Sequence, residues 1–219
     1  MDENNDVFHI MHTMRAMRRL KPDPVPDELI EKILIAGTAA PNGGNSQRWR
    51  FMVIKDPEIK SQIQPYYRKA YEEVVVARHA AAAPPNDPEH AEAHAQHARN
   101  LSATEYLTDH FHEAPVWIVA CLNAGKNATR STPGSIYPAV QNMLLAARAV
   151  GLGATLTARH LHFEKEVEAI LGLPEGMHSY AIIPIGYPMG KFGPTGRSPL
   201  SEVVYLDRWG ESWPGAGSN

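Results

Sequence analysis

Arginines near the amino end have the types and spacing needed to hold a phosphate group. Arg15, Arg18 and Arg19 cluster in the segment TMRAMRRL, at the end of a helical pattern of apolar residues. Guanidinium forks match phosphate oxygens, and each charge-assisted hydrogen bond contributes about 1.5–3 kcal/mol. Cations in a last helical turn also oppose the negative end of the helix dipole. A phosphate clamp and a helix-end charge pattern therefore both explain these residues.

A second stretch has the composition of a loop that borders a planar ring. It runs from Ala40 to Phe51, APNGGNSQRWRF, and joins a helical pattern to an apolar strand pattern. Gly43 and Gly44 permit positive φ and close approach of the backbone to a ligand. Its side-chain amides, which offer both donors and acceptors for the edge of a heterocycle, are Asn42, Asn45 and Gln47. The alternative is a Gly/Asn-rich surface turn between helix and strand.

Composition argues against several classes of protein. The 219 residues are expected to form one domain spanning residues 1–219. A net charge of −3 and a pI of about 6.4 give no general attraction to nucleic acid or to acidic membrane surfaces. The single Cys121 excludes an internal disulfide framework and is interpreted as a small buried apolar residue. No apolar run approaches the ~18 residues of a membrane span, and no signal peptide is recognisable, so we expect a soluble cytoplasmic protein.

Hydrophobic periodicity predicts the elements that position these residues. Helices are predicted over residues 7–19, 28–40, 60–78, 135–150 and 163–171. Short apolar strands are predicted over residues 50–55, 114–122, 180–187 and 203–206. Asp27 is expected to be the N-cap of the second helix. Helices long enough to flank short strands indicate an α+β layer fold.

Two segments stand outside this pattern. Residues 80–100 are rich in alanine, proline and histidine, so we expect an exposed, lid-like excursion. His90, His94 and His97 would share a helix face with spacing that suits zinc, but alanine-rich solvated helices tolerate histidine and no cysteine lies nearby. We therefore expect no metal site. Residues 207–219 are rich in glycine and proline and are expected to form an extended C-terminal arm.

Several motifs, in this order, resemble those of FMN-dependent nitroreductases. They are TMRAMRRLKPDPVP, APNGGNSQRWRFMVI, AVQNMLLAARAVGLGATL, IIPIGYP and GRSPLSEVV. The resemblance covers the chain from about Met11 to Val204, apart from the histidine-rich excursion. It implies a nitroreductase-like fold, with a central, mostly antiparallel sheet flanked by helices, in an intertwined homodimer. The helix predicted over residues 135–150 matches the central dimer helix of that family.

The resemblance also implies a set of FMN-binding residues. Those matching the phosphate-binding cluster are Arg15, Ala16, Met17, Arg18 and Arg19, with Arg197 as a second, late cation. Many members have serine where Ala16 stands, so one hydroxyl contact is absent here. Those matching the loop that meets the flavin ring from the second subunit are Pro41, Asn42, Gly43 and Asn45, and Ser135 matches a position near the cofactor. Those matching the stretch whose backbone N–H faces flavin N5 are Leu156, Thr157, Ala158 and Arg159.

The implied activity needs no catalytic side chain, because the cofactor carries the chemistry. The resemblance implies a two-electron ping-pong oxidoreductase, with NADPH or NADH as transient donor and a nitroaromatic, quinone or similar small electron-poor aromatic as acceptor. Two alternatives stay open. One is reductive dehalogenation of an aromatic amino acid, for which Lys69, Tyr71 and Glu72 lie in the right neighbourhood. The other is a protein that sequesters FMN without turnover.

Overall fold

The molecule is built on a four-stranded antiparallel sheet. The computed structural model describes residues 6–125 and 128–215, and the strand order is β1-β2-β4-β3. The strands are β1 (Trp49–Ile54), β2 (Val116–Asn123), β3 (Gly153–Ala154) and β4 (Met177–Gly186). In the centre of the sheet Ile118 of β2 faces Val53 of β1 and Ile183 of β4. The predicted α+β fold with an antiparallel sheet is confirmed.

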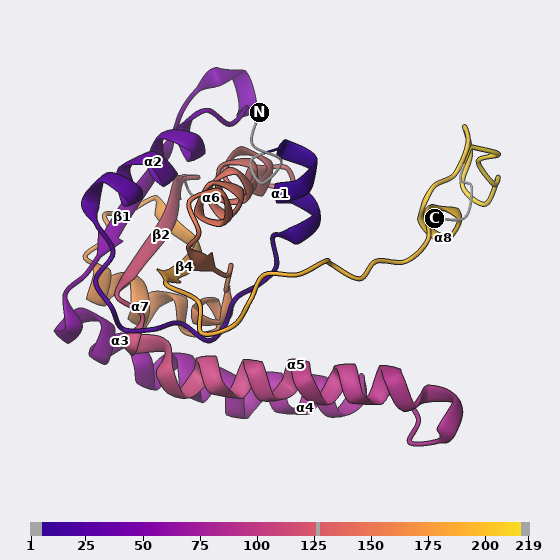
Figure 1. The fold of residues 1–219 in the computed structure, drawn as a ribbon. Coiled ribbons are helices and arrows are strands. Elements are labelled where there is room, and N and C mark those ends of the chain that lie inside the picture. The colour runs from indigo at the N-terminus through magenta and orange to yellow at the C-terminus, as the bar shows by residue number, and fades with distance from the viewer. Residues whose placement is uncertain (1–5, 126–127, 216–219) are drawn as a thin grey trace.

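Helices cover both faces of this sheet (Figure 1). On one face lie α2 (Asp27–Thr38) and α6 (Tyr137–Ala149), and on the other lie α3 (Pro57–Ala70) and α7 (Glu164–Leu171). Along β2 the side chains alternate between the two cores, so Ile118 packs in the first and Trp117 in the second. This explains why β2 is an almost continuous apolar run, as the sequence indicated.

Close packing of α2 on α6 depends on Gly37. A Cβ atom added at Gly37 would lie 2.2 Å from Cε and 2.8 Å from Cγ of Met143, whose side chain is fully buried. The two helices therefore approach so closely that a side chain at residue 37 would require Met143 to move. Both helices contribute to the core on this face of the sheet, so the contact lies within that core.

The first helix is much shorter than predicted. Helix α1 (Val7–Thr13) ends where Met14 turns to an extended ψ of 116°. The chain then runs along the sheet edge, where the N–H of Met17 donates to the carbonyl of Ala154 at 3.0 Å. Further on, the N–H of Lys21 donates to the carbonyl of Tyr187 at 2.8 Å. The basic residues after Met14 thus follow the helix rather than form its last turn, and the helix-dipole explanation for them is wrong.

Two smaller predictions are also wrong. Asp27 is not an N-cap: α2 begins at Asp27, its N-cap position is Pro26, and the Asp27 carboxylate pairs with Lys55 of the chain after β1. Residues 203–206 are not a strand, because α8 (Leu200–Val203) forms a short helical turn after Pro199. Proline before a first turn favours helix initiation, since its preset φ lies close to the helical value.

Residues 80–100 form the outer part of a helical hairpin. After α3 the chain continues through a π-helical turn (Tyr71–Val75) into α4 (Val76–Ala81), then through a 3₁₀ turn (Pro88–His90) into α5 (Ala91–His110). Figure 1 shows α4 and α5 side by side, projecting from the body. The predicted excursion is exposed, but it is helical. Only the base of α5 enters the core, through Leu107 and the following Phe111.

The carboxyl-terminal segment leaves the body as an arm. Beyond Gly190 the chain extends past the sheet and carries α8 far from the core (Figure 1). The arm exposes many apolar side chains, namely Leu200, Val203, Tyr205, Leu206, Trp209 and Trp213. Trp209 is 88% exposed. Within residues 6–125 and 128–215, no helix combines the length and apolar character that a membrane span needs.

Candidate functional site

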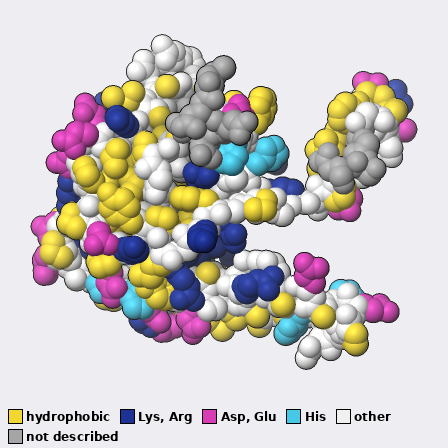
Figure 2. Space-filling model, in the orientation of Figure 1, with side chains coloured by type: hydrophobic (Ala, Val, Ile, Leu, Met, Phe, Trp, Pro, Cys, Tyr) yellow, Lys and Arg dark blue, Asp and Glu magenta, His cyan; other side chains and the backbone are white. Residues whose placement is uncertain are grey.

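A basic cavity of about 910 Å³ lies between the amino-terminal arginines, the start of the arm and the tip of α5. Its lining includes Arg15, Ala16, Arg18, Arg197 and residues 194–196 of the arm, with Glu89, Glu92, Gln96 and Asn100 on the hairpin side. Figure 2 shows lysine and arginine side chains gathered along the hollow between the body and the hairpin. The structure therefore brings together Arg15, Ala16, Arg18 and Arg197, which the sequence places some 180 residues apart.

Backbone pairing between the two chain ends builds this cavity. The N–H of Met189 donates to the carbonyl of Arg19 at 3.0 Å, and the N–H of Thr195 donates to the carbonyl of His12 at 3.0 Å. A Cβ added at Gly193 would be in ordinary van der Waals contact with Arg15, 3.9 Å from the guanidinium Nη1, so the two segments lie side by side. The arm thus runs antiparallel to the arginine segment, and this pairing sets Arg197 at the same cavity as Arg15.

Two carboxylates, those of Glu89 and Glu92, line the same cavity as the arginines but form no ion pair with them. Burial lowers the pKa of Arg18; the nearby Tyr67 phenol raises it, while the guanidinium groups of Arg159 and Arg15 lower it further. Among the described residues, no carboxylate forms an ion pair with Arg15, Arg18 or Arg197. Arg18 is partly buried while Arg15 and Arg197 are exposed, and a partly buried cation beside other cations without a paired anion is electrostatically unfavourable. A bound dianion such as a phosphate monoester would neutralise them, so the residues present fit that group.

Two of the predicted phosphate contacts lie elsewhere. The guanidinium of Arg19 sits 4.5 Å from the centroid of the Tyr106 ring, and its Nη2 donates to Ser102 Oγ at 3.1 Å. Arg19 thus faces α5 and does not line the cavity. Met17 is buried in the core, and its N–H is bonded to Ala154. Of the five residues in the amino-terminal cluster, Arg15, Ala16 and Arg18 line the cavity.

The stretch after β3 does not line the basic cavity, but it precedes Arg159, which acts electrostatically on Arg18. The N–H of Thr157 is already used, since it donates to the carbonyl of Ile182 at 3.0 Å, and Thr157 Oγ1 lies 3.1 Å from the Tyr67 hydroxyl. Neither Leu156 nor Ala158 has a backbone acceptor for its N–H within the described parts of the chain. Leu156 and Ala158, rather than Thr157, are therefore the amides available to a ligand.

Sequence analysis missed the side chain of Arg159. Its guanidinium lies 4.8 Å from the centroid of the buried Tyr67 ring and donates to Thr108 Oγ1 at 2.6 Å. It also acts electrostatically on Arg18. The signal that could have suggested a role is a lone arginine directly after the Leu156–Ala158 stretch. The direction of the Arg159 side chain, however, depends on its contacts with α3 and α5, and no local sequence pattern reveals those contacts.

The Gly/Asn-rich loop forms a separate surface with Ser135. Asn42 Oδ1 accepts the N–H of Gln47 at 2.8 Å, while Gly44 and Asn45 adopt positive φ values of 59° and 50°. The N–H of Gly43 donates to Ser135 Oγ at 3.2 Å. The structure thus brings Ser135 to the predicted loop of Pro41, Asn42, Gly43 and Asn45, and none of these residues lines the basic cavity. This loop, after α2, lies at the top of Figure 1.

Two of the candidate dehalogenase residues, Lys69 and Tyr71, have different contacts. Lys69 Nζ lies 4.8 Å from the centroid of the Phe163 ring and 3.8 Å from a carboxylate oxygen of Glu73. Tyr71 instead faces the guanidinium of Arg159 at 5.4 Å. Lys69 and Tyr71 therefore contact different neighbours at the base of the hairpin.

Cys121 is not part of a reactive site. It is fully buried in β2, and burial raises the pKa of its thiol to about 12, with the negative charge of Glu168 adding to the effect. A thiol with such a pKa is a poor nucleophile at neutral pH. The interpretation of Cys121 as a small buried apolar residue is confirmed.

Comparison with known proteins assigns the family. The sequence profile described as "Nitroreductase family" matches residues 13–187. The chain belongs to the nitroreductase family, as its motifs indicated. It is 32% identical to "NADH dehydrogenase" of Thermus thermophilus over 87% of this chain and 90% of that protein. It is also 27% identical to "Iodotyrosine deiodinase" of Daphnia pulex, over 92% of this chain and 66% of that protein.

A solved structure agrees with the fold. The chain is similar to a nitroreductase with bound FMN from Desulfitobacterium hafniense, with a TM-score of 0.68 and 19% sequence identity. The match covers 94% of this chain and all of that one. At this level of identity the likeness establishes the fold, and the use of the cavity is argued below from the residues of this chain.

Proposed function

We propose that this protein is an FMN-dependent oxidoreductase that takes two electrons from NADPH or NADH and delivers them to a small electron-poor aromatic acceptor, such as a nitroaromatic or a quinone. The observation that carries the proposal is the cluster of Arg15, Arg18 and Arg197 around a cavity of about 910 Å³, without an ion-paired carboxylate among the described residues. Membership of the nitroreductase family and the "NADH dehydrogenase" name of the Thermus relative support it.

The cavity residues bind and orient the cofactor. Arg15, Arg18 and Arg197 would hold the phosphate through charge-assisted hydrogen bonds, and the N–H of Ala16 would add a backbone donor. A serine at the position of Ala16 would add a hydroxyl contact to the phosphate. Without it, phosphate binding in this chain would depend more on the three arginines. The amides of Leu156 and Ala158 would donate to the ring edge. When bound, FMN supplies the two-electron chemistry of the reaction.

The protein's electrostatics favour accumulation of negative charge in the cavity. The guanidinium groups of Arg159 and Arg15 act electrostatically on Arg18, and Arg159 lies 4.8 Å from the centroid of the Tyr67 ring. In the net reaction the nicotinamide donor loses two electrons and one proton, and the acceptor gains two electrons and two protons. Solvent supplies the second proton, so the proposed reaction requires no acidic or basic side chain.

The proposal includes a homodimer in which a second copy completes the site. The loop of residues 41–45 contacts Ser135 and lies away from the cavity of its own chain, so the same loop of a second copy would border the ring. Between α1, α2 and α6 there is an open apolar groove of about 380 Å³, to which Ala36, Leu145 and Ala149 contribute. An exposed groove on α6 and an apolar arm are surfaces that a dimer would cover.

Anaerobic spectroscopy tests this function. FMN-loaded protein should lose its visible flavin absorption when NADPH or NADH is added and regain it when a quinone or nitroaromatic is added. Flavin that binds but is not bleached by either nicotinamide would indicate a protein that sequesters FMN. Failure to bind FMN at all would reject the assignment of the cavity.

Reductive dehalogenation is a second candidate, because several curated relatives are named iodotyrosine deiodinase. The separate contacts of Lys69 and Tyr71 argue against a preformed site for a zwitterionic amino acid in this chain. Iodide release from 3-iodotyrosine, with NADPH or dithionite as reductant, distinguishes the two activities. Release at a rate comparable with quinone reduction would favour dehalogenation.

A further inference from the structure

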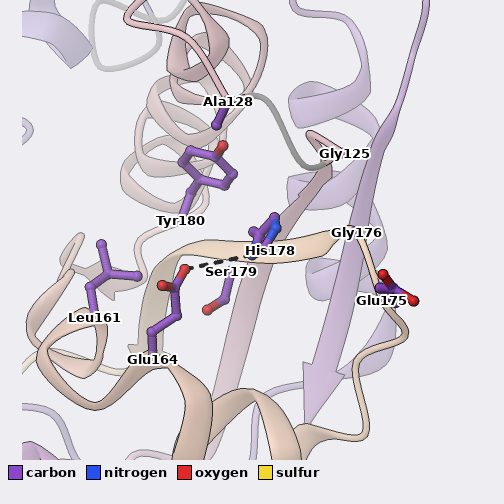
Figure 3. A pocket seen from close by; sticks show the side chains of 9 residues that line it. All are labelled: Gly125, Ala128, Leu161, Glu164, Glu175, Gly176, His178, Ser179 and Tyr180. Atoms are coloured by element: carbon purple, nitrogen blue, oxygen red, sulfur yellow. Dashed lines mark ion pairs between the residues drawn. The ribbon is translucent and has the colours of Figure 1, made fainter.

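Glu164, Glu168 and His178 converge beside a second cavity, which has a volume of about 510 Å³. Figure 3 shows Glu164 and His178 at this cavity, with a dashed line marking their ion pair. Glu164 and Glu168 are one turn apart on α7, so they project from the same helix face, and His178 comes from β4. One ligand atom from each of the three side chains lies within 4.8 Å of the others. Leu161, Tyr180 and other residues distinct from those of the arginine cavity line this space.

The spacing of these atoms differs from that of ordinary histidine–carboxylate pairs in the same molecule. His178 Nδ1 lies 3.7 Å from a Glu164 oxygen and 3.6 Å from a Glu168 oxygen. Elsewhere Nδ1 of His90 lies 2.8 Å from Asp87, and Nδ1 of His110 lies 2.9 Å from Glu113. The His90 pair is hydrogen-bonded, whereas His178 faces two carboxylates beyond hydrogen-bond distance of either.

That spacing suits a metal ion between the three groups. Metal–ligand distances of about 2.0–2.2 Å in a tetrahedral zinc site place neighbouring ligand atoms roughly 3.3–3.6 Å apart. Of the two His178–carboxylate distances, 3.6 Å lies at the upper limit of this range and 3.7 Å lies just above it. Side-chain movements of a few tenths of an ångström would bring these pairs to coordination distance.

A buried hydrogen-bond chain already orients one of the carboxylates. Glu168 Oε1 accepts the N–H of Ser179 at 2.6 Å and lies 3.0 Å from Ser179 Oγ, which leaves Oε2 directed towards His178. The fully buried His160 lies behind, with Nε2 3.1 Å from the same Ser179 Oγ. Outer residues that orient a metal-binding carboxylate in this way are typical of metal sites.

We propose that Glu164, Glu168 and His178 bind one divalent transition-metal ion, Zn²⁺ in preference to Mg²⁺ or Ca²⁺, with a fourth position open to the cavity. An imidazole nitrogen among few ligands favours zinc over Mg²⁺ and Ca²⁺, which prefer oxygen ligands in larger number. The ion would fasten α7 to β4 and leave room for water or a small anion. The site is separate from the arginine cavity and does not depend on the proposed oxidoreductase activity.

The test uses tag-free, full-length protein stripped with a chelator and then titrated. Calorimetry with Zn²⁺ should give one ion per chain, and Co²⁺ should give the visible absorption bands of a low-symmetry, four- or five-coordinate site. His178→Ala and Glu168→Gln should each weaken Zn²⁺ binding at least tenfold. Zn²⁺ should raise the melting temperature of the original protein and not that of His178→Ala.

Matched controls separate this site from other histidines and acidic groups. Glu166→Gln alters an exposed carboxylate on the same helix, and His94→Ala alters a histidine of the hairpin; both should leave Zn²⁺ affinity unchanged. Glu164→Gln, a change at a side chain that is 43% exposed, gives a second loss-of-binding variant that keeps the fold. No bound ion, or one whose affinity depends on His94 and not on His178, would overturn the proposal.

Discussion

Arg18 is held in a position that is unfavourable for the protein without a ligand. It is partly buried and close to the cations of Arg15 and Arg159, and burial lowers its pKa. Removing such a charge relieves repulsion and desolvation in the unliganded state while removing a ligand contact. Removing a residue that serves only stability would destabilise the unliganded protein. A substitution of Arg18 therefore distinguishes a binding role from a structural one.

We predict that Arg18→Met weakens FMN binding about 10- to 100-fold, because one charge-assisted contact of about 1.5–3 kcal/mol is lost. The same substitution should leave the melting temperature of the FMN-free protein unchanged or raise it. Fluorescence titration and thermal unfolding measure the two effects. Arg19→Met is the matched comparison: its guanidinium lies against Tyr106, so FMN affinity should change less than threefold. A lower melting temperature for unliganded Arg18→Met would indicate a structural role instead.

His160 makes stability depend on pH in a definite direction. The ring is fully buried, and burial lowers its pKa from 6.5 to about 4. Between these values the unfolded chain binds a proton that the folded chain does not, so stability is lost as the pH falls from about 6.5 to about 4. The full loss is on the order of 3 kcal/mol.

Replacing the ring should flatten this profile. His160→Gln is expected to be less stable at pH 7, because the bond to Ser179 Oγ is disturbed, but to lose less stability on acidification. Urea unfolding at several pH values, with a chelator present, measures the difference between the two proteins. A constant difference between pH 7 and pH 4 would contradict the assignment to His160.

At the scale of elements, the contact between α2 and α6 depends on the absence of a side chain at residue 37. The nearest atoms to an added Cβ belong to Met143, which is itself fully buried, so it would have to repack inside the core. Gly37→Ala should therefore destabilise the protein by about 1–3 kcal/mol, although alanine normally favours a helix over glycine. Chemical unfolding measures the loss.

A compensating substitution provides the control. Shortening Met143 to alanine removes the clashing atoms, so Gly37→Ala should cost less in a Met143→Ala background than in the original protein. The double variant should therefore lose less stability than the sum of the losses of the two single variants. Equal losses in both backgrounds would show that the cost of Gly37→Ala has another origin.

Local pattern predicted most elements but not where some of them end. The buried strands β2 and β4 and the helices α2, α6 and α7 follow apolar periodicity closely. Helix α1 ends early because Met17 and Lys21 pair with the sheet edge, a tertiary effect that helical periodicity cannot reveal. Arg19 was assigned to the phosphate by its neighbours in sequence, whereas the extended chain turns it towards Tyr106.

The metal-ligand candidates show the same limit. Glu164 and Glu168 have helical spacing, yet His178 joins them only because β4 follows α7 back along the sheet, and local periodicity does not reveal that packing. The basic cavity was easier to predict. Its arginines belong to motifs that resemble those of a known family; the structure places Arg15, Arg18 and Arg197 around one cavity, and their binding of FMN stays a prediction.

At the scale of the whole molecule, the arm exposes a group of large apolar side chains to solvent. Ending the chain after Ser198 keeps Arg197 but removes the apolar residues from Leu200 onward, including Trp209. We predict that this truncation shifts the protein from dimer towards monomer at micromolar concentration, because the apolar residues of the arm would pack on a second copy. Sedimentation velocity measures the shift. A truncated protein that still sediments as a dimer would show that the arm does not hold the two copies together.

The central claim is that three arginines form a phosphate site, and the affinity for FMN compared with riboflavin tests it most directly. Riboflavin has the same ring and ribityl chain but lacks the phosphate. Because Arg15, Arg18 and Arg197 lack an ion-paired carboxylate among the described residues, we predict that the protein binds FMN at least 100-fold more tightly than riboflavin. The preference should shrink at least tenfold in Arg18→Met. Equal affinity for the two flavins, or a preference that Arg18→Met leaves intact, would contradict the account.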